Sequence, residues 1–147
     1  MDPKATVQAL FVAIQTANFE KAKSLLTNDF MFSGPVPEPV NGPAWLDMSQ
    51  KLKTAFPDLD YQFKIEGVNG NIVNISAQLK GTHKANLDLT SMHMGVIPTT
   101  GKAFVAAREH GKVTVQGDKV KSLANEPTEG AGLMAILHQL GVKVPAM

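Results

Sequence analysis

The spacing of apolar residues changes near Leu59 from the period of a helix to that of a strand, and this change most constrains the fold. Before Leu59 the apolar residues recur every three or four positions, which is the period of an amphipathic helix. After Leu59 they alternate with polar residues, which is the period of a strand with one buried face. Helices followed by antiparallel hairpins of this kind predict an α+β fold.

Helices are expected in the first part of the chain. The first spans residues 3–16 after the N-cap Asp2, the second is short and capped by Asn18, and another begins near Pro43. A strand at 29–33 and a rigid proline-rich loop separate the second helix from the next one.

Two hairpins and a last helix are expected in the second part. The hairpins turn at the Asn-Gly pair 69–70 and the Gly-Asp pair 117–118, and the helix spans residues 128–140. The N-terminal helices must cover one face of the sheet. We therefore expect a curved antiparallel sheet wrapped around them as a cystatin-like cone, which encloses a cavity for a ligand. Residues 1–147 are expected to form a single domain.

Composition excludes several classes of function. The chain has no cysteine, which rules out a disulfide scaffold, thiol catalysis and cysteine-rich zinc modules. A balance of 14 basic against 13 acidic residues gives no electrostatic reason to bind nucleic acid or an anionic membrane. The apolar run at residues 9–14 is too short to span a bilayer and lacks the flanks of a signal peptide, so we expect a cytoplasmic protein.

Cofactor motifs are also missing from the sequence. The four histidines, at 83, 93, 110 and 138, have no short ligand spacing, so no metal site is expected. The glycines form neither a Walker loop nor a GxGxxG string, and there is no GxSxG elbow for serine hydrolysis. We expect a protein that uses no cofactor.

Four short strings occur in order along the chain: AFPDL at 55–59, GTH at 81–83, IPTTGK at 97–102 and QLGV at 139–142. Together they resemble the SnoaL-like polyketide cyclases, or ester cyclases, of the nuclear transport factor 2-like superfamily. The resemblance covers most of the chain and implies a cone with an apolar cavity, often dimeric through the open sheet face. For an active member it implies ring closure of a polyketide by an aldol step, in which a carboxylate moves a proton without metal or cofactor.

The chain departs from the family pattern at the end of its last strand. Better-known members carry a Trp there and, a few residues later, an Asp that acts as acid and base. Here Ala124 stands at the Trp position, and no Asp follows Asp118. Glu126 and Glu129 are the carboxylates near that place. The connection between the GTH and PTTG strings is also longer than usual and reads KANLDLTSMHMGVI.

Proton transfer beside a carbonyl needs a base whose pKa is raised by apolar surroundings, and a donor for the developing enolate oxygen. The candidates are His83, Glu109 and Glu126. His83 has the inward parity of Ile75 and Leu79, at the end of the strand where a cone would open. Its structural alternative is a strand-end histidine bonded to a backbone carbonyl.

Glu109 belongs to a strand expected to begin near residue 102. If that strand is regular, Glu109 and Val105 face the cavity, whereas Arg108 and His110 face outward. A bulge at Gly111 would exchange the faces and make His110 a ligand-binding residue instead. The structural alternative for Glu109 is a surface carboxylate beside Arg108, the only arginine of the chain.

Glu126 follows the inward parity of Val120, Ser122 and Ala124, and stands in for the missing Asp. Its structural alternative is an exposed carboxylate before the last helix, where the helix dipole favours a negative charge. Asn125 then faces outward, or exchanges roles with Glu126 if the strand ends early.

Three further residues are expected to bind the ligand. Trp45 offers a flat apolar wall and Tyr61 a phenol donor, although a lone Trp on a helix stripe commonly belongs to the core. Met92, beside His93 in the lengthened connection, is expected to form an adaptable lid, or else to cap the core.

Two functions fit these observations. The first is a cyclase or isomerase that moves protons on a carbonyl, polyketide-like substrate. The second is a binding or interaction domain that kept the cavity and lost the catalytic Asp. Under either function the partner is a small hydrophobic or weakly polar organic molecule, and a second copy is expected on the open sheet face.

Overall fold

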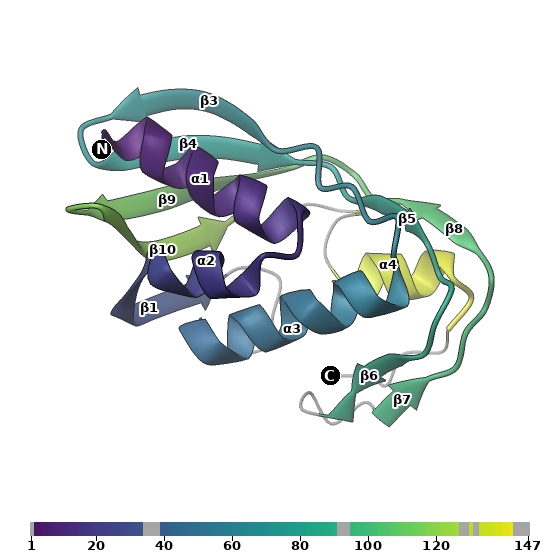
Figure 1. Cartoon of the computed structure of the whole chain (residues 1–147). Coiled ribbons are helices and arrows are strands. Elements are labelled where there is room, and N and C mark those ends of the chain that lie inside the picture. Colours follow the sequence, from purple (N-terminus) through teal and green to yellow (C-terminus); the bar gives the residue numbers. More distant parts are fainter. Residues whose placement is uncertain (1, 34–38, 91–94, 127–129, 131–132, 143–147) are drawn as a thin grey trace.

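A six-stranded sheet with helices on one face forms the main layer of the structure (Figure 1). The structure is a computed structural model that describes residues 2–33, 39–90, 95–126, 130 and 133–142. The sheet curves around the helices without closing, which confirms the expected α+β fold. Its order is β2-β1-β10-β9-β4-β3. These strands are β1 (Leu26–Ser33), β2 (Val40–Asn41), β3 (Lys64–Asn69), β4 (Ile72–Ala77), β9 (Glu109–Gln116) and β10 (Lys119–Asn125).

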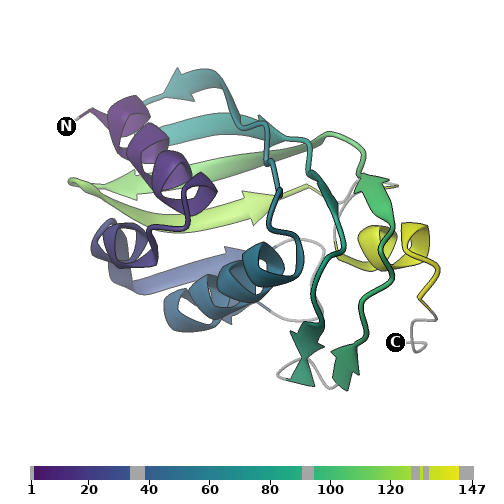
Figure 2. The ribbon, with the colours of Figure 1, turned by 45° about the vertical axis from the view of Figure 1, so that its right-hand side comes forward.

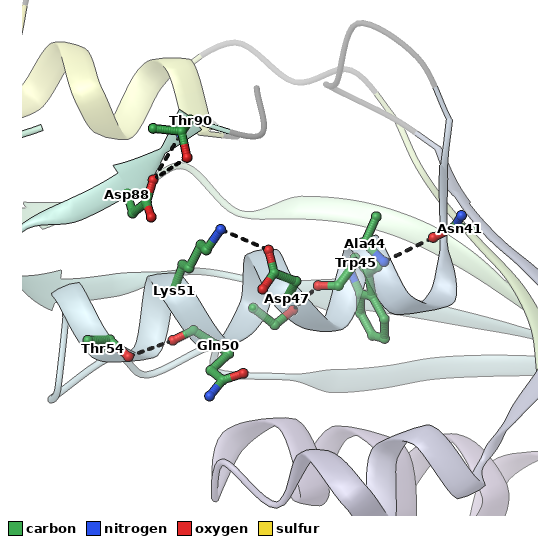
Figure 3. A network of polar contacts seen from close by, with 10 residues as sticks. Asn41, Ala44, Trp45, Asp47, Gln50, Lys51, Thr54, Asp88 and Thr90 are labelled. Carbon is green, nitrogen blue, oxygen red and sulfur yellow. Dashed lines mark hydrogen bonds and ion pairs between the residues drawn. The ribbon is translucent and has the colours of Figure 1, made fainter. Parts of the chain in front are cut away.

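The helices on the covered face begin at the predicted caps Asp2 and Asn18, and next to Pro43 for the third. They are α1 (Pro3–Gln15), α2 (Phe19–Ser24) and α3 (Gly42–Ala55). The side chains of Asp2, Asn18 and Asn41 accept backbone N–H groups of the first turn of each helix, at 2.7, 3.3 and 2.9 Å respectively. Figure 3 shows the Asn41 cap at the start of α3.

Both predicted hairpins are present. Residues 117–118 join β9 to β10 as expected, whereas residues 70–71 join β3 to β4, one position later than the expected 69–70, because Asn69 pairs with Ile72. Gly70 and Gly117 have φ angles of +63° and +62°. One pairing differs from the expected antiparallel sheet, because β1 runs parallel to β10.

A second region of the molecule is built from two small sheets and a helix. β5 (Lys80–Thr82) pairs with β8 (Ala103–Val105), and β6 (Leu87–Leu89) pairs with β7 (Gly95–Ile97). The lengthened connection therefore contains a hairpin, which lies near the C-terminal end of α3 (Figure 2). The Lys51 ammonium on α3 bonds Asp47 at 2.9 Å and faces Asp88 of this hairpin (Figure 3).

Two pairs of hydrogen bonds hold this second region together, and residues of the family-like strings take part in both. Asp58 accepts hydrogen bonds from the backbone N–H and the hydroxyl of Thr82, at 2.8 and 2.9 Å. Asn86 accepts from the N–H and hydroxyl of Thr99 in the same way, at 3.1 and 3.2 Å. Asp58, Thr82 and Thr99 of these strings thus take part in hydrogen bonds that join segments distant in the sequence.

Three strand predictions need correction. The strand expected from Leu59 enters the ladder only at Lys64, after an isolated bridge between Asp60 and Lys80. The strand expected from residue 102 is broken at 106–108, so Val105 is exposed although it was expected inside. β1 begins at Leu26, earlier than the expected 29–33, because α2 ends at Ser24.

The helix α4 spans Leu133–Gln139. It is followed by the predicted stop residue Gly141, whose φ is +77°. Its predicted first turn, at residues 128–132, lies largely outside the described residues. Gln139 fastens α4 to β8, since its amide nitrogen donates to the carbonyl of Val105 at 2.8 Å and its amide oxygen accepts the N–H of Val105 at 3.1 Å. In the described part of the chain, the helices are all too short or too polar to cross a membrane.

Candidate functional site

An apolar pocket of about 110 Å³ lies between the helices and the inner face of the sheet. Helices α1 and α3, the strands β4, β9 and β10, and Ile136 of α4 all contribute to its wall. Most of the lining is aliphatic or aromatic. The polar lining groups are Ser49, Tyr61, Glu109 and Asn125.

Glu109 is the ionisable carboxyl in this pocket. It is 9% exposed, and its Oε2 atom has no hydrogen-bond partner among the described residues. Because burial disfavours the charged form, the pKa of the Glu109 carboxyl is raised. A carboxyl in such surroundings binds and releases a proton closer to neutral pH than a surface carboxyl does.

The regular pairing of β9 with β4 decides on which side of the sheet Glu109 lies. β9 pairs with β4 in unbroken register from Thr114 to Glu109, so the bulge considered at Gly111 does not form. His110 is exposed on the outer face, where its Nδ1 lies 2.7 Å from Oε1 of Glu66. The alternative in which His110 takes the place of Glu109 in the cavity is therefore wrong.

Arg108 does not pair with Glu109. Its guanidinium donates to the hydroxyl of Ser76 at 2.9 Å and to the carbonyl of Gln62 at 3.3 Å. The alternative in which Glu109 is a surface carboxylate beside Arg108 is wrong.

Asn125, and not Glu126, is the polar residue that β10 places in the pocket. The inward parity expected for Glu126 is wrong because the register of β10 shifts between Val120 and Ser122. An extra residue in one strand reverses the facing of every later residue. Glu126 is exposed, and its backbone N–H donates to the carbonyl of His110 at 2.8 Å.

Gly111 makes room for Asn125 on the neighbouring strand. The two residues are cross-strand partners, and a Cβ atom at position 111 would collide with Oδ1 of Asn125. Glu109 lies two positions from Gly111 on the same face. Diagonal neighbours of this kind are about 7 to 8 Å apart, within reach of one small ligand.

The expected aromatic residues line the pocket. Tyr61 is 8% exposed, and burial raises the pKa of its phenol, so the hydroxyl stays protonated and can donate. Trp45 packs against Phe30 and Phe32, with ring centroids 5.2 and 6.1 Å apart. The hydroxyl of Ser49 donates to the carbonyl of Trp45 at 2.9 Å within α3.

His83 is fully buried, but it lies outside this pocket. Its Nδ1 accepts the N–H of Thr100 at 3.1 Å and contacts the Thr100 hydroxyl at 3.0 Å. An Nδ1 that accepts a hydrogen bond belongs to a neutral ring. Burial lowers the pKa of this imidazole, which favours the same neutral form. Met92 lies outside the described residues.

The family model for the SnoaL-like polyketide cyclases matches residues 4–125, from the first helix to the last strand of the sheet. This chain belongs to the SnoaL-like polyketide cyclase family. None of the curated proteins compared with this SnoaL-like chain matches it.

Solved structures share the SnoaL-like fold at low identity. IdmH from Streptomyces antibioticus, provisionally assigned as a polyketide cyclase, has a TM-score of 0.72 at 20% identity, covering 97% of this chain and all of the other. A protein from Jannaschia sp. CCS1, provisionally assigned as a SnoaL-like polyketide cyclase, has a TM-score of 0.72 at 18% identity, covering 97% and 93%. AclR from Streptomyces galilaeus, provisionally assigned as a hydroxylase, has 0.69 at 17%, covering 97% of each chain.

The SnoaL-like pocket contains no metal cluster within the described residues, where no three His, Asp or Glu side chains gather as ligands. Asn125 lines the pocket, although the sequence favoured Glu126 there. The extra residue in β10 decides which of the two faces inward, and it depends on the pairing of β10 with β9, so the alternation of apolar and polar residues does not reveal it.

Proposed function

We propose that this SnoaL-like protein is an enzyme that moves a proton beside the carbonyl of an apolar, polyketide-like ketone, with Glu109 as the acid and base. One observation carries the proposal. The Glu109 carboxyl is 9% exposed in an apolar pocket, and its Oε2 is without a hydrogen-bond partner in the described part of the chain. A buried carboxyl with no structural partner is costly to keep unless it has a chemical role.

The proton transfer uses groups that the pocket supplies. The Glu109 carboxylate takes a proton from the carbon next to the substrate carbonyl, and the electron pair of that C–H bond forms the enolate. The negative charge then lies on the carbonyl oxygen. The hydroxyl of Tyr61 and the amide N–H groups of Asn125 are the donors for that oxygen.

Ring closure follows with the same proton. The enolate carbon attacks a second carbonyl of the same molecule, one carbon–carbon bond forms, and the resulting alkoxide receives the proton from Glu109. The product is an isomer of the substrate, so the step needs neither an oxidant nor a reductant. Proton transfer by a positioned side chain contributes about 100- to 10,000-fold to such a rate.

A binding domain is the second candidate function, and Asn125 favours it. At the end of β10 the pocket has a neutral amide, which can orient a carbonyl oxygen but cannot move a proton. Under this function a hydrophobic ketone raises the melting temperature and is not converted.

Hydrogen–deuterium exchange distinguishes the two functions. The probe is 2-tetralone, a planar bicyclic ketone, in D2O, with exchange at the carbon beside the carbonyl followed by NMR. We expect the protein to accelerate this exchange and Glu109→Gln to lower the accelerated rate by about 100-fold or more. Glu66→Gln, which removes a carboxyl from the outer face of the same sheet, is the matched control. Equal rates for the parent and Glu109→Gln would overturn the enzyme, and binding without exchange would identify the binding domain.

A further inference from the structure

A surface groove lies on the other side of one pocket wall. The groove has a volume of about 500 Å³ and runs between the outer part of α1 and residues 60–65. Phe63 lines both this groove and the inner pocket, and it is the one residue that the two linings share. Among the described residues, the Phe63 side chain is therefore part of the wall between the two spaces.

Phe63 is the middle ring of a three-ring stack. Its centroid lies 3.9 Å from that of Phe11, which lines the groove, and 4.9 Å from that of Tyr61, which lines the pocket. The rings are nearly parallel, at 11° and 9°. When Phe63 swings outward, the gap is bounded by two flat apolar faces, which suits a chain or planar part of a ligand.

Phe63 belongs to a segment outside the regular ladder, in which the preceding Gln62 is bonded to Asp60 and Arg108. Phe63 lies between the isolated bridge of Asp60 and the first ladder pair of β3 at Lys64, outside the regular strand. The preceding Gln62 has a φ of +46°, a conformation that non-glycine residues rarely adopt and that occurs often at ligand clamps and switches. Reorienting Phe63 therefore disrupts no ladder hydrogen bond of the six-stranded sheet.

The groove offers mainly apolar surface to a ligand. Several of its polar groups are already bonded within the protein: the amide of Gln15 bonds the carbonyl of Leu59 and the N–H of Tyr61, at 2.8 and 2.9 Å. The carboxylate of Asp60 accepts the N–H of Gln62 at 3.0 Å. The apolar surface for a ligand comes from Phe11, Val12, Phe63 and Ile65, and the lining also includes Lys4, Gln8, Thr16 and Gln62.

We propose that this groove is the second compartment of the ligand site, joined to the inner pocket when Phe63 swings out. It takes the apolar tail of an elongated ketone whose carbonyl end lies at Glu109, and in this respect it rests on the proposed function. The inner pocket, at about 110 Å³, is small against the roughly 300 to 1,000 Å³ of most small-molecule sites. The two compartments together accommodate a molecule of polyketide length.

The test compares two probes by titration calorimetry: 2-tetralone and 6-octyloxy-2-tetralone, which differ only in the tail. Each methylene buried tightens binding by roughly fourfold, so burial of three tail carbons makes the long probe bind roughly 60-fold more tightly. Val12→Trp fills the groove from an exposed helix position that does not line the inner pocket. We expect this variant to reduce the advantage of the long probe to less than about fivefold and to leave 2-tetralone binding unchanged. Lys23→Trp, exposed on α2 and outside both linings, is the matched control.

Phe63→Ala removes this part of the wall and gives a second, kinetic measurement. Stopped-flow quenching of the single tryptophan, Trp45, follows the arrival of the long probe in the inner pocket. We expect the association rate to rise by about tenfold, because binding no longer waits for the ring to move.

The outcomes separate this inference from the proposed function. If 2-tetralone binds and exchanges but the longer probe gains nothing, the groove compartment is wrong and the proposed function stands. If the long probe gains affinity equally in Val12→Trp, its tail lies elsewhere and the inference is overturned. If neither probe binds, both proposals fail. A long-probe advantage that Val12→Trp removes supports the groove even where no exchange is catalysed.

Discussion

Replacing Glu109 by Gln is expected to stabilise the protein at neutral pH while removing its proposed chemistry. Gln has nearly the shape of a protonated Glu and carries no charge, so it reproduces the form that the apolar pocket favours. The parent must instead keep a carboxylate at a position that is 9% exposed and where Oε2 has no partner in the described residues. Leaving a buried polar group unsatisfied costs about 1 to 3 kcal/mol, and more when the group is charged. The Gln amide is neutral but has no partner there either, so we expect Glu109→Gln to gain only the extra cost of the charge at neutral pH, about 1.4 kcal/mol for each unit by which the pKa is raised.

The gain has a defined dependence on pH. The carboxyl has an ordinary pKa of 4.5 in the unfolded chain and a raised pKa in the folded protein. Between these two values the folded state holds a proton that the unfolded state has released, so the stability of the parent falls as pH rises through this window. Below pH 4.5 the variant and the parent therefore have similar stability, and the difference grows with pH until it levels off above the folded-state pKa. Because one pKa unit corresponds to about 1.4 kcal/mol, the height of the plateau measures the shift.

Urea unfolding from about pH 4 to pH 8, followed by the fluorescence of Trp45, provides the measurement. Glu20→Gln is the control, because Glu20 is exposed at the start of α2, and it should show no such growth with pH. A Glu109→Gln variant that is less stable than the parent at neutral pH would refute the reasoning. A difference that does not change with pH would refute it equally.

Three other predictions follow from the packing. Gly111→Ala is expected to lower the free energy of unfolding in urea by about 1 to 3 kcal/mol, because the added Cβ meets Oδ1 of Asn125 and lies 2.9 Å from the carbonyl oxygen of Ala124. Gly67→Ala is the control, because its Cβ would meet nothing closer than 3.9 Å. Equal effects of the two variants would contradict the explanation. The neutral ring of His83 contributes stability that is complete above its ordinary pKa of 6.5 and is lost as pH falls toward its lowered folded-state pKa, so His83→Gln should weaken the acid dependence of the urea midpoint. An unchanged dependence would argue against a buried neutral ring. The uncovered face of the six-stranded sheet is expected to pair with a second copy, which sedimentation tests directly, and a monomer at micromolar concentration would count against it.

The parts of the fold that the sequence predicted are those with a local cause. Asp2 and Asn18 cap their helices through side chains three residues away from the bonded N–H. The hairpin turns at 70–71 and 117–118 each contain a glycine that accepts a positive φ. In each case the residues that decide the structure are neighbours in the chain.

The sequence-based predictions were wrong where contacts with distant segments determine which way a side chain faces. The facing of Asn125 and Glu126 depends on a register shift at Ser122, which is set by the pairing of β10 with β9. Val105 turned outward because the chain leaves the ladder between β8 and β9. His83 was correctly expected to be buried, but alternation along a strand does not say whether a buried side chain meets a pocket or, as here, the turn at Thr100.

The bond between Gln139 and Val105 has a consequence for association between chains. β8 pairs with β5 on one side, so its other side would present an unpaired N–H and carbonyl, which attract strands of other molecules. The side-chain amide of Gln139 uses one N–H and its oxygen much as a peptide group of a neighbouring strand would. It bonds both the carbonyl and the N–H of Val105. Helix α4 thus shields a strand edge from aggregation as well as contributing to the pocket wall. Without the Gln139 amide, the unpaired backbone groups of Val105 and its exposed side chain would be available to pair with strands of other molecules.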